Sequence, residues 1–129
     1  MGKRRILIVD DDAHYADVLK TALEGIGAYE VRTESEPTRA VAAARDFKPD
    51  LIVLDIMMPE VDGGEVAAEI GEDEALQHVP LVFLTAAVTQ EEVAARGGVI
   101  GGRVFMAKSA PLRKLVHFLE EQLGKSDAS

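Results

Sequence analysis

Leu51-Ile52-Val53-Leu54-Asp55 is the stretch that decides the fold, because a carboxylate follows directly on a continuous apolar run. Continuous runs of this kind are typical of strands that are buried on both faces of a parallel sheet. Ile6 to Val9 and Leu81 to Leu84 have the same form, and Tyr29 to Glu34 and Val104 to Ala107 are weaker candidates. The sequence therefore predicts five strands.

Longer stretches with helical spacing separate these strands. The first has its apolar positions at Tyr15, Val18, Leu19, Ala22, Leu23 and Ile26, and should end near Gly25 and Gly27. The next three helices are expected over Thr38 to Phe47 after Pro37, Asp62 to Ile70, and Gln90 to Arg96. Thr89 followed by Glu92 is a capping-box pattern, which predicts the start of the last of these. A fifth should begin at Pro111 and place Leu112, Leu115, Val116, Leu119 and Leu123 on its apolar side.

Strands that alternate with helices predict a doubly wound α/β sandwich, in which right-handed helical crossovers join parallel strands. The 129 residues fit one domain over 1–129, and we expect the polar tail at 124–129 to be disordered. In such sheets ligands bind beyond the carboxyl ends of the strands, where the strand order reverses. The residues that follow each strand are therefore the candidates for function.

Polar side chains follow four of the five predicted strands: Asp10-Asp11-Asp12, Asp55, Thr85 and Lys108. Several carboxylates at one place repel one another unless a cation compensates their charge. Mg²⁺ prefers oxygen ligands and is usually held by one or two carboxylates and a phosphate. A lysine and a hydroxyl can then bind phosphoryl oxygens. The set predicts phosphoryl transfer, in which positioning and charge neutralisation do most of the work.

Each of these residues also has an ordinary structural explanation. Asp12 is better interpreted as the N-cap of the first helix than as a metal ligand. Asp10 and Asp11 taken alone are equally well solvated acids at a strand end. Thr85 alone is more often a loop hydroxyl, and Lys108 alone is usually a surface lysine. The combination is much more specific than any one member.

Composition excludes several classes of protein. The net charge of −9, from 23 acidic and 14 basic residues, argues against a nucleic-acid groove. No cysteine is present, which excludes a disulfide scaffold, a zinc-cysteine site and a thiol nucleophile. The apolar run after the basic start Gly2-Lys3-Arg4-Arg5 is too short for a signal peptide or a membrane span, so we interpret these charges as solvated residues ahead of the first strand. We expect a cytoplasmic protein that binds no membrane.

Several motifs closely resemble the response-regulator receiver domain of two-component signalling, in its stand-alone, chemotaxis-regulator-like form. They are Ile6-Leu7-Ile8-Val9-Asp10-Asp11-Asp12, Leu54-Asp55-Ile56-Met57-Met58-Pro59 through Asp62-Gly63, Leu84-Thr85-Ala86 and Phe105-Met106-Ala107-Lys108. The resemblance covers nearly the whole chain. It implies a flavodoxin-like doubly wound sheet of five parallel strands in the order 2-1-3-4-5, with five helices.

The same resemblance implies a role for each acidic residue. Asp55 would take a phosphoryl group from a histidine kinase or a histidine phosphotransfer protein. Asp10, Asp11 and Asp55 would bind Mg²⁺ together with the backbone carbonyl of Met57. The domain would not be an enzyme beyond its own phosphorylation and dephosphorylation, and would be a monomer or a phosphorylation-dependent dimer.

Thr85 and Lys108 would bind phosphoryl oxygens, and Thr85 with Phe105 would form the switch. Movement of this pair would alter the face made by the fourth helix, fifth strand and fifth helix, which would bind a downstream protein target. The alternative for Phe105 is an ordinary core ring on an edge strand.

Two segments depart from the family pattern. Ser109-Ala110 follows Lys108 where the family has proline, and a cis bond before a non-proline residue costs roughly 2.5–4 kcal/mol, so we expect a trans bond there. The direction in which the Lys108 side chain points is then in question. The second segment is the glycine-rich stretch 97–102, which predicts a short or loose fourth helix.

Two other functions compete with this one. An aspartate-nucleophile phosphatase would need a second aspartate two residues after Asp55, where this chain has Met57. A pseudo-receiver, an interaction module that keeps the fold without phosphorylation, is opposed by the intact acidic cluster and by Thr85 and Lys108. The altered loop after Lys108 keeps the pseudo-receiver open as the alternative.

Overall fold

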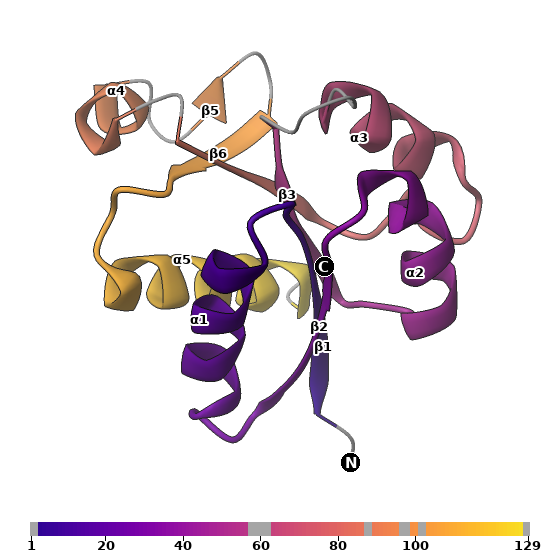
Figure 1. The fold of residues 1–129 in the computed structure, drawn as a ribbon, viewed down its shortest axis with the longest axis horizontal. Helices are drawn as coiled ribbons and strands as arrows, with labels where there is room; N and C mark the ends of the chain where they lie inside the picture. Colours follow the sequence, from indigo (N-terminus) through magenta and orange to yellow (C-terminus); the bar gives the residue numbers. More distant parts are fainter. Residues whose placement is uncertain (1–2, 57–62, 87–88, 96–98, 101–102, 128–129) are drawn as a thin grey trace.

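The computed structural model describes residues 3–56, 63–86, 89–95, 99–100 and 103–127 (Figure 1). In this part of the chain one sheet has the strand order β2-β1-β3-β4-β6-β5. Its strands are β1 (Arg4–Val9), β2 (Tyr29–Glu34), β3 (Leu51–Asp55), β4 (Leu81–Thr85), β5 (Val99–Ile100) and β6 (Arg103–Ala107). All neighbouring pairs except β5·β6 are parallel, which confirms the five predicted parallel strands and their order.

The short strand β5 was not predicted. Val99 and Ile100 pair antiparallel with Val104 and Arg103 of β6, so the sheet gains a sixth strand at its edge. The glycines of this segment predicted a short or loose fourth helix and gave no sign of a strand. Two adjacent β-branched residues favour a strand once a neighbouring strand edge is available to them, and that edge is a tertiary feature.

The helices follow the predicted order with changed ends. They are α1 (Ala13–Glu24), the 3₁₀ turn η1 (Pro37–Arg39), α2 (Ala40–Phe47), α3 (Gly63–Glu72), α4 (Gln90–Ala95) and α5 (Leu112–Asp127). The second predicted helix thus begins with a 3₁₀ turn, which is common at helix starts. The helix α5 continues through four residues of the tail that we expected to be disordered. No proline interrupts its last turn, so its backbone hydrogen bonding can continue.

Each face of the sheet is covered by its own helices, as Figure 1 shows for α1 and α5 on one side and α2 and α3 on the other. Successive strand residues point to opposite faces. In β1, Ile6 and Ile8 belong to the apolar cluster that includes residues of α1 and α5, whereas Leu7 and Val9 belong to the cluster that includes residues of α2 and α3. This is why the strands are apolar without interruption rather than alternating.

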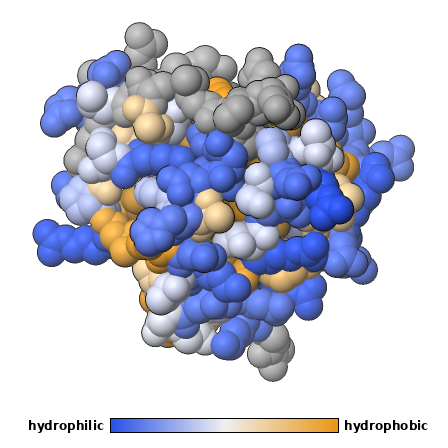
Figure 2. Space-filling view, viewed as in Figure 1, coloured by the Kyte–Doolittle hydropathy of each residue, from blue (hydrophilic) through white to orange (hydrophobic). Residues whose placement is uncertain are grey.

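The predicted apolar faces of α1 and α5 were too wide. Leu19 and Leu23 of α1 are buried, but Val18 is 40% exposed and Ile26 45% exposed. Leu112, at the start of α5, is 39% exposed. A helix lying on a sheet buries only the stripe that faces it, so the flanking apolar residues stay on the surface. Figure 2 shows the resulting small apolar patch over α1 and the start of α5.

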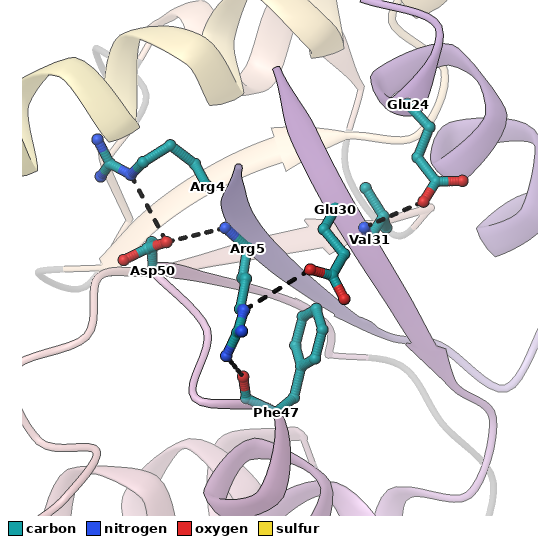
Figure 3. Close-up of polar contacts among 7 residues, drawn as sticks. All are labelled: Arg4, Arg5, Glu24, Glu30, Val31, Phe47 and Asp50. Atoms are coloured by element: carbon teal, nitrogen blue, oxygen red, sulfur yellow. Dashed lines mark hydrogen bonds and ion pairs between the residues drawn. The ribbon is translucent and has the colours of Figure 1, made fainter. Parts of the chain in front are cut away.

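Arg4 and Arg5 belong to β1 and do not precede it, although their side chains remain partly exposed to solvent. Figure 3 shows the backbone N–H of Arg5 donating to Asp50 Oδ2 at 2.8 Å and Arg5 Nη1 donating to the Phe47 carbonyl at 3.0 Å. Arg4 Nε lies 3.6 Å from the same Asp50 oxygen, and Arg5 Nε lies 3.7 Å from Glu30 Oε1. These contacts tie β1 to β2 and to the start of β3 at the end of the sheet opposite the strand ends that carry the polar residues.

Both predicted helix caps are confirmed. Asp12 Oδ1 accepts a hydrogen bond from the Tyr15 N–H at 3.1 Å and caps α1. At the start of α4, the Glu92 N–H donates to Thr89 Oγ1 at 3.1 Å, and the Thr89 N–H donates to Glu92 Oε1 at 3.2 Å. These reciprocal bonds are those of a capping box.

Candidate functional site

The ends of β1 and β3 bring two buried carboxylates together. Val9 is paired with Leu54 in the sheet, so Asp10 and Asp55 come next on adjacent strands. The Asp10 N–H donates to the Glu34 carbonyl at 3.1 Å, which keeps Asp10 in line with the sheet. Asp10 is 1% exposed and Asp55 3% exposed. The predicted first and third strand ends therefore meet.

The ends of β4 and β6 supply the other two predicted residues. Thr85 is 1% exposed and is paired with Ala107. The Lys108 N–H donates to the Thr85 carbonyl at 2.9 Å, so the lysine leaves the sheet beside this threonine. Lys108 Nζ then lies 3.2 Å from Asp55 Oδ2 and 2.7 Å from Asp10 Oδ2. The lysine bridges the two carboxylates.

The missing proline after Lys108 does not misdirect this side chain. No cis peptide bond occurs in the described residues, so the Lys108–Ser109 bond is trans, as we expected. The Ala110 N–H donates to the Ala107 carbonyl at 3.1 Å and closes a tight turn around the lysine. The short path into α5 is therefore compatible with the contact between Lys108 and the acidic residues.

Lys108 partly neutralises the acidic cluster at the site. Burial acts to lower the pKa of Lys108, but the adjacent Asp10 and Asp55 carboxylates outweigh it and raise the pKa above its ordinary value. Lys108 therefore remains a cation at neutral pH. Its charge compensates part of the repulsion between two carboxylates that are almost completely removed from water.

One oxygen of Asp10 is left without a hydrogen bond. Asp10 Oδ1 accepts from the Asp12 N–H at 2.9 Å. Asp10 Oδ2 is buried and has no hydrogen-bond partner in the described part of the chain. Its nearest described charge is Lys108 Nζ, which forms an ion pair with it at 2.7 Å. A buried carboxylate oxygen in this condition is available to a further cation.

The acidic cluster has the composition of a divalent-cation site. Asp10, Asp11 and Asp55 each present a carboxylate oxygen, and these oxygens lie within 4.8 Å of one another. Asp11 is exposed, so a cation could keep waters on that side. The three residues could hold a metal ion. The fourth expected ligand, the Met57 carbonyl, lies outside the described residues.

Comparison with known families decides the assignment. The model of the response regulator receiver domain matches residues 6–120 of the chain. The chain belongs to the response-regulator receiver family. Members of this family interact with histidine kinases and with downstream targets, and they are phosphoacceptors rather than true enzymes. The resemblance that the motifs suggested is thereby confirmed.

Named relatives place this receiver domain among both short and long regulators. The chain is 31% identical over 122 residues to the polar-differentiation response regulator DivK of Brucella ovis, covering 94% of this chain and 97% of DivK. It is 33% identical over 125 residues to the DNA-binding response regulator MtrA of Mycolicibacterium paratuberculosis, covering 97% of this chain but only 53% of MtrA. The chain thus spans about half the length of MtrA.

A solved structure confirms the flavodoxin-like fold. The CheY-like response regulator receiver domain protein from Methanospirillum hungatei superposes with a TM-score of 0.80 at 25% identity, over 98% of each chain. Within the described residues no helix has both the length and the apolar character that crossing a bilayer requires. MtrA is named for DNA binding, so our expectation that no nucleic acid is bound remains a prediction.

Phe105 is a buried ring on the same face of the sheet as Thr85. It is 8% exposed and stacks on Phe83 with 5.0 Å between ring centroids and 30° between ring planes. Val93 of α4 belongs to the same cluster. The described contacts are those of a packed core ring, and they also connect Phe105 to α4.

Two residues that contribute to the site were missed by the sequence analysis. Tyr15 was assigned to the apolar face of α1, but its ring lies against Lys108. Gly63 begins α3 against the backbone that leaves β3, and a Cβ there would lie 2.7 Å from the Asp55 carbonyl oxygen. The glycine could have been suspected from its place in the family motif. Nothing local in the sequence marks the tyrosine.

Proposed function

We propose that this receiver domain accepts a phosphoryl group on Asp55 from a histidine kinase or a histidine phosphotransfer protein. The observation that supports the proposal is the position of Asp55: it is buried, is within 4.8 Å of the Asp10 and Asp11 oxygens, and lies 3.2 Å from Lys108 Nζ. A carboxylate next to a lysine and to further acids suits a reaction that transfers a group rich in negative charge.

In the transfer, a carboxylate oxygen of Asp55 forms a bond to phosphorus as the bond from phosphorus to the donor nitrogen breaks. The electron pair of that bond stays with the imidazole nitrogen, and Asp55 becomes an acyl phosphate. Lys108 would leave its contact with Asp55 to bind a phosphoryl oxygen. The Thr85 hydroxyl, at the adjacent strand end, would donate to another.

The metal would be Mg²⁺, held by Asp10, Asp11, Asp55 and the Met57 carbonyl. Bound there, it would supply positive charge between the carboxylates and the phosphoryl oxygens. The buried Asp10 oxygen that lacks a hydrogen bond supports this assignment. The same residues would permit the loss of the phosphoryl group to water, so the domain catalyses only its own modification.

The output would be a change at the face formed by α4, β6 and α5. Movement of Thr85 toward the phosphoryl group would repack Phe105, which lies in one apolar cluster with Val93 of α4. A hollow of about 530 Å³ lies on this face, lined by Met106, Arg113, Lys114, His117, Phe118 and Glu121. We place the downstream protein partner there, with the domain at 1–129 acting as a cytoplasmic monomer or a phosphorylation-dependent dimer.

Mass spectrometry after incubation with Mg²⁺ and acetyl phosphate tests the proposal. We expect one added phosphoryl group on the wild-type protein and none on Asp55→Asn. Asp46→Asn is the matched control, because Asp46 is 77% exposed, lies in the last turn of α2 and pairs with Arg32. Its uptake should equal that of the wild type.

Three outcomes would count against the proposal. A folded wild-type protein that takes up no phosphoryl group, under conditions that modify a known receiver, would favour the pseudo-receiver. Continuous phosphate release from unrelated monoesters would favour a phosphatase. Equal labelling of wild type and Asp55→Asn would place the modification elsewhere.

A further inference from the structure

Tyr15 lies beside the bridging lysine. It belongs to the first turn of α1, and its backbone N–H donates to the Asp12 cap that fixes the start of this helix. Lys108 Nζ lies over the Tyr15 ring at 4.8 Å from the ring centroid. The ammonium group is thus in contact with two carboxylates and with an aromatic face, and the lysine side chain is only 14% exposed.

The contact with the ring is electrostatically favourable. The face of an aromatic ring carries partial negative charge and attracts an ammonium within about 6 Å of its centroid. The attraction strengthens when water is excluded, as it is in large part around Lys108, whose side chain is 14% exposed. A lysine side chain is otherwise flexible and has many rotamers to lose when it is fixed. A ring against its ammonium group restricts those rotamers.

The Tyr15 hydroxyl makes no described contact that would explain why this residue is a tyrosine. It is buried and has no hydrogen-bond partner within the described residues. Burial and the nearby Asp10 and Asp55 charges raise the pKa of Tyr15 to about 12, so the ring stays neutral and adds no negative charge to the cluster. The contact that distinguishes this side chain from an ordinary core residue is the one with Lys108.

We propose that Tyr15 is a positioning residue whose ring face holds the Lys108 ammonium group at Asp55, ready for a phosphoryl oxygen. This rests on the proposed function of Asp55. During transfer from acetyl phosphate, the bond from Asp55 oxygen to phosphorus forms, the bond from phosphorus to acetate breaks, and acetate leaves with the electron pair. Lys108 neutralises charge on the transferring oxygens, so its placement affects the rate.

Tyr15→Leu and Tyr15→Phe separate the ring from the hydroxyl. Tyr15→Leu keeps apolar volume but removes the aromatic face, and phosphorylation by acetyl phosphate should become about threefold to tenfold slower. Tyr15→Phe keeps the face and should stay within about twofold of the wild type. Tyr29→Phe is the matched control, because the Tyr29 hydroxyl bonds to Glu120 Oε2 at 3.1 Å and makes no described contact with the site.

The dependence on Lys108 distinguishes positioning from a general structural effect. In a Lys108→Ala background, Tyr15→Leu should cause no further slowing, because the group that it positions is absent. An equal slowing in both backgrounds would overturn the proposal. So would a Tyr15→Phe variant as slow as Tyr15→Leu, since the ring face would then not be the part that matters.

A second measurement does not depend on phosphorylation. In protein with isotope-labelled lysine, the Lys108 Hε signal, assigned by its loss in Lys108→Ala, should be shifted upfield by the Tyr15 ring. The shift should persist in Tyr15→Phe and Tyr29→Phe and disappear in Tyr15→Leu. Wild type that takes up no phosphoryl group would refute the proposed function of Asp55, whereas an unchanged Lys108 signal in folded Tyr15→Leu would refute the role of Tyr15.

Discussion

Lys108 Nζ lies 2.7 Å from Asp10 Oδ2, an oxygen that is buried and without a hydrogen bond. The lysine and a metal ion would therefore draw on the same carboxylate. Lys108 partly neutralises Asp10 when no metal is bound, and its positive charge would oppose a divalent cation placed next to it.

Lys108→Ala should bind Mg²⁺ about tenfold more tightly than the wild type, because a like charge within a few ångströms of the metal is removed. Calorimetric titration of the unphosphorylated protein measures the effect. Lys114→Ala is the control, since Lys114 is an exposed lysine on α5 with no described contact to the cluster. Weaker binding by Lys108→Ala than by wild type would contradict the proposed competition.

Asp11 and Asp12 are adjacent acids with different expected roles. Asp11→Ala should weaken Mg²⁺ binding strongly, because it removes one of the three clustered carboxylates. Asp12→Ala should leave the affinity nearly unchanged but lower the free energy of unfolding by about 1 kcal/mol, because it removes the N-cap of α1. Titration calorimetry and urea unfolding without metal measure the two effects. The prediction fails if Asp12→Ala is the stronger metal-binding defect.

Gly63 allows α3 to begin against the strand that carries Asp55. A Cβ at this position would lie 2.6 Å from Ile56 Cα and 2.7 Å from the Asp55 carbonyl oxygen, and neither backbone atom can move aside cheaply. Gly63→Ala should lower the free energy of unfolding by roughly 1–3 kcal/mol and slow phosphorylation, because it displaces the backbone of Asp55.

Gly71→Ala in the same helix is the matched control for this substitution. A Cβ at Gly71 would meet no atom within 4 Å. The change should raise the free energy of unfolding by about 0.5–1 kcal/mol, because alanine favours the helix more than glycine does. Similar effects of the two substitutions on urea unfolding would show that the close approach at Gly63 does not exist.

In metal-free protein, the free energy of unfolding should fall at high pH because groups at the site lose protons. Burial, followed by the charges of Asp10 and Asp55, raises the pKa of Tyr15 from 10.0 to about 12. Because the pKa of Tyr15 is higher in the folded than in the unfolded protein, Tyr15 contributes fully to the free energy of unfolding below pH 10. This contribution is lost as the pH rises toward 12. Lys108, whose pKa is also raised, acts in the same direction above its ordinary 10.5.

Absorbance titration of tyrosinate, with chelator present, measures this behaviour. The Tyr15 component should titrate near pH 12 and be absent in Tyr15→Phe, which should also lose less stability between pH 10 and 12 than the wild type does. At neutral pH, Tyr15→Phe should be at least as stable as the wild type, because it removes a buried hydroxyl without a partner. A Tyr15 component near pH 10 would show that this side chain is not shielded from water.

Local patterns in the sequence were sufficient for the five parallel strands, the caps at Asp12 and Thr89, and the polar residues at the strand ends. Continuous apolar runs indicate strands buried on both faces, and the carboxyl ends of parallel strands must share one edge of the sheet. Asp10, Asp55, Thr85 and Lys108 could therefore be assigned to one edge of the sheet, and the strand order that the family resemblance implies brings them close together.

Packing between distant segments decided the rest. The contact of Tyr15 with Lys108, the bridge from Lys108 to both carboxylates, the exposure of Val18 and the edge strand β5 all depend on how helices and strands lie against one another. Helical periodicity identifies an apolar side but not which part of it a sheet will cover. Tyr15 has the same spacing as a core residue, and only the fold turns its ring toward the lysine.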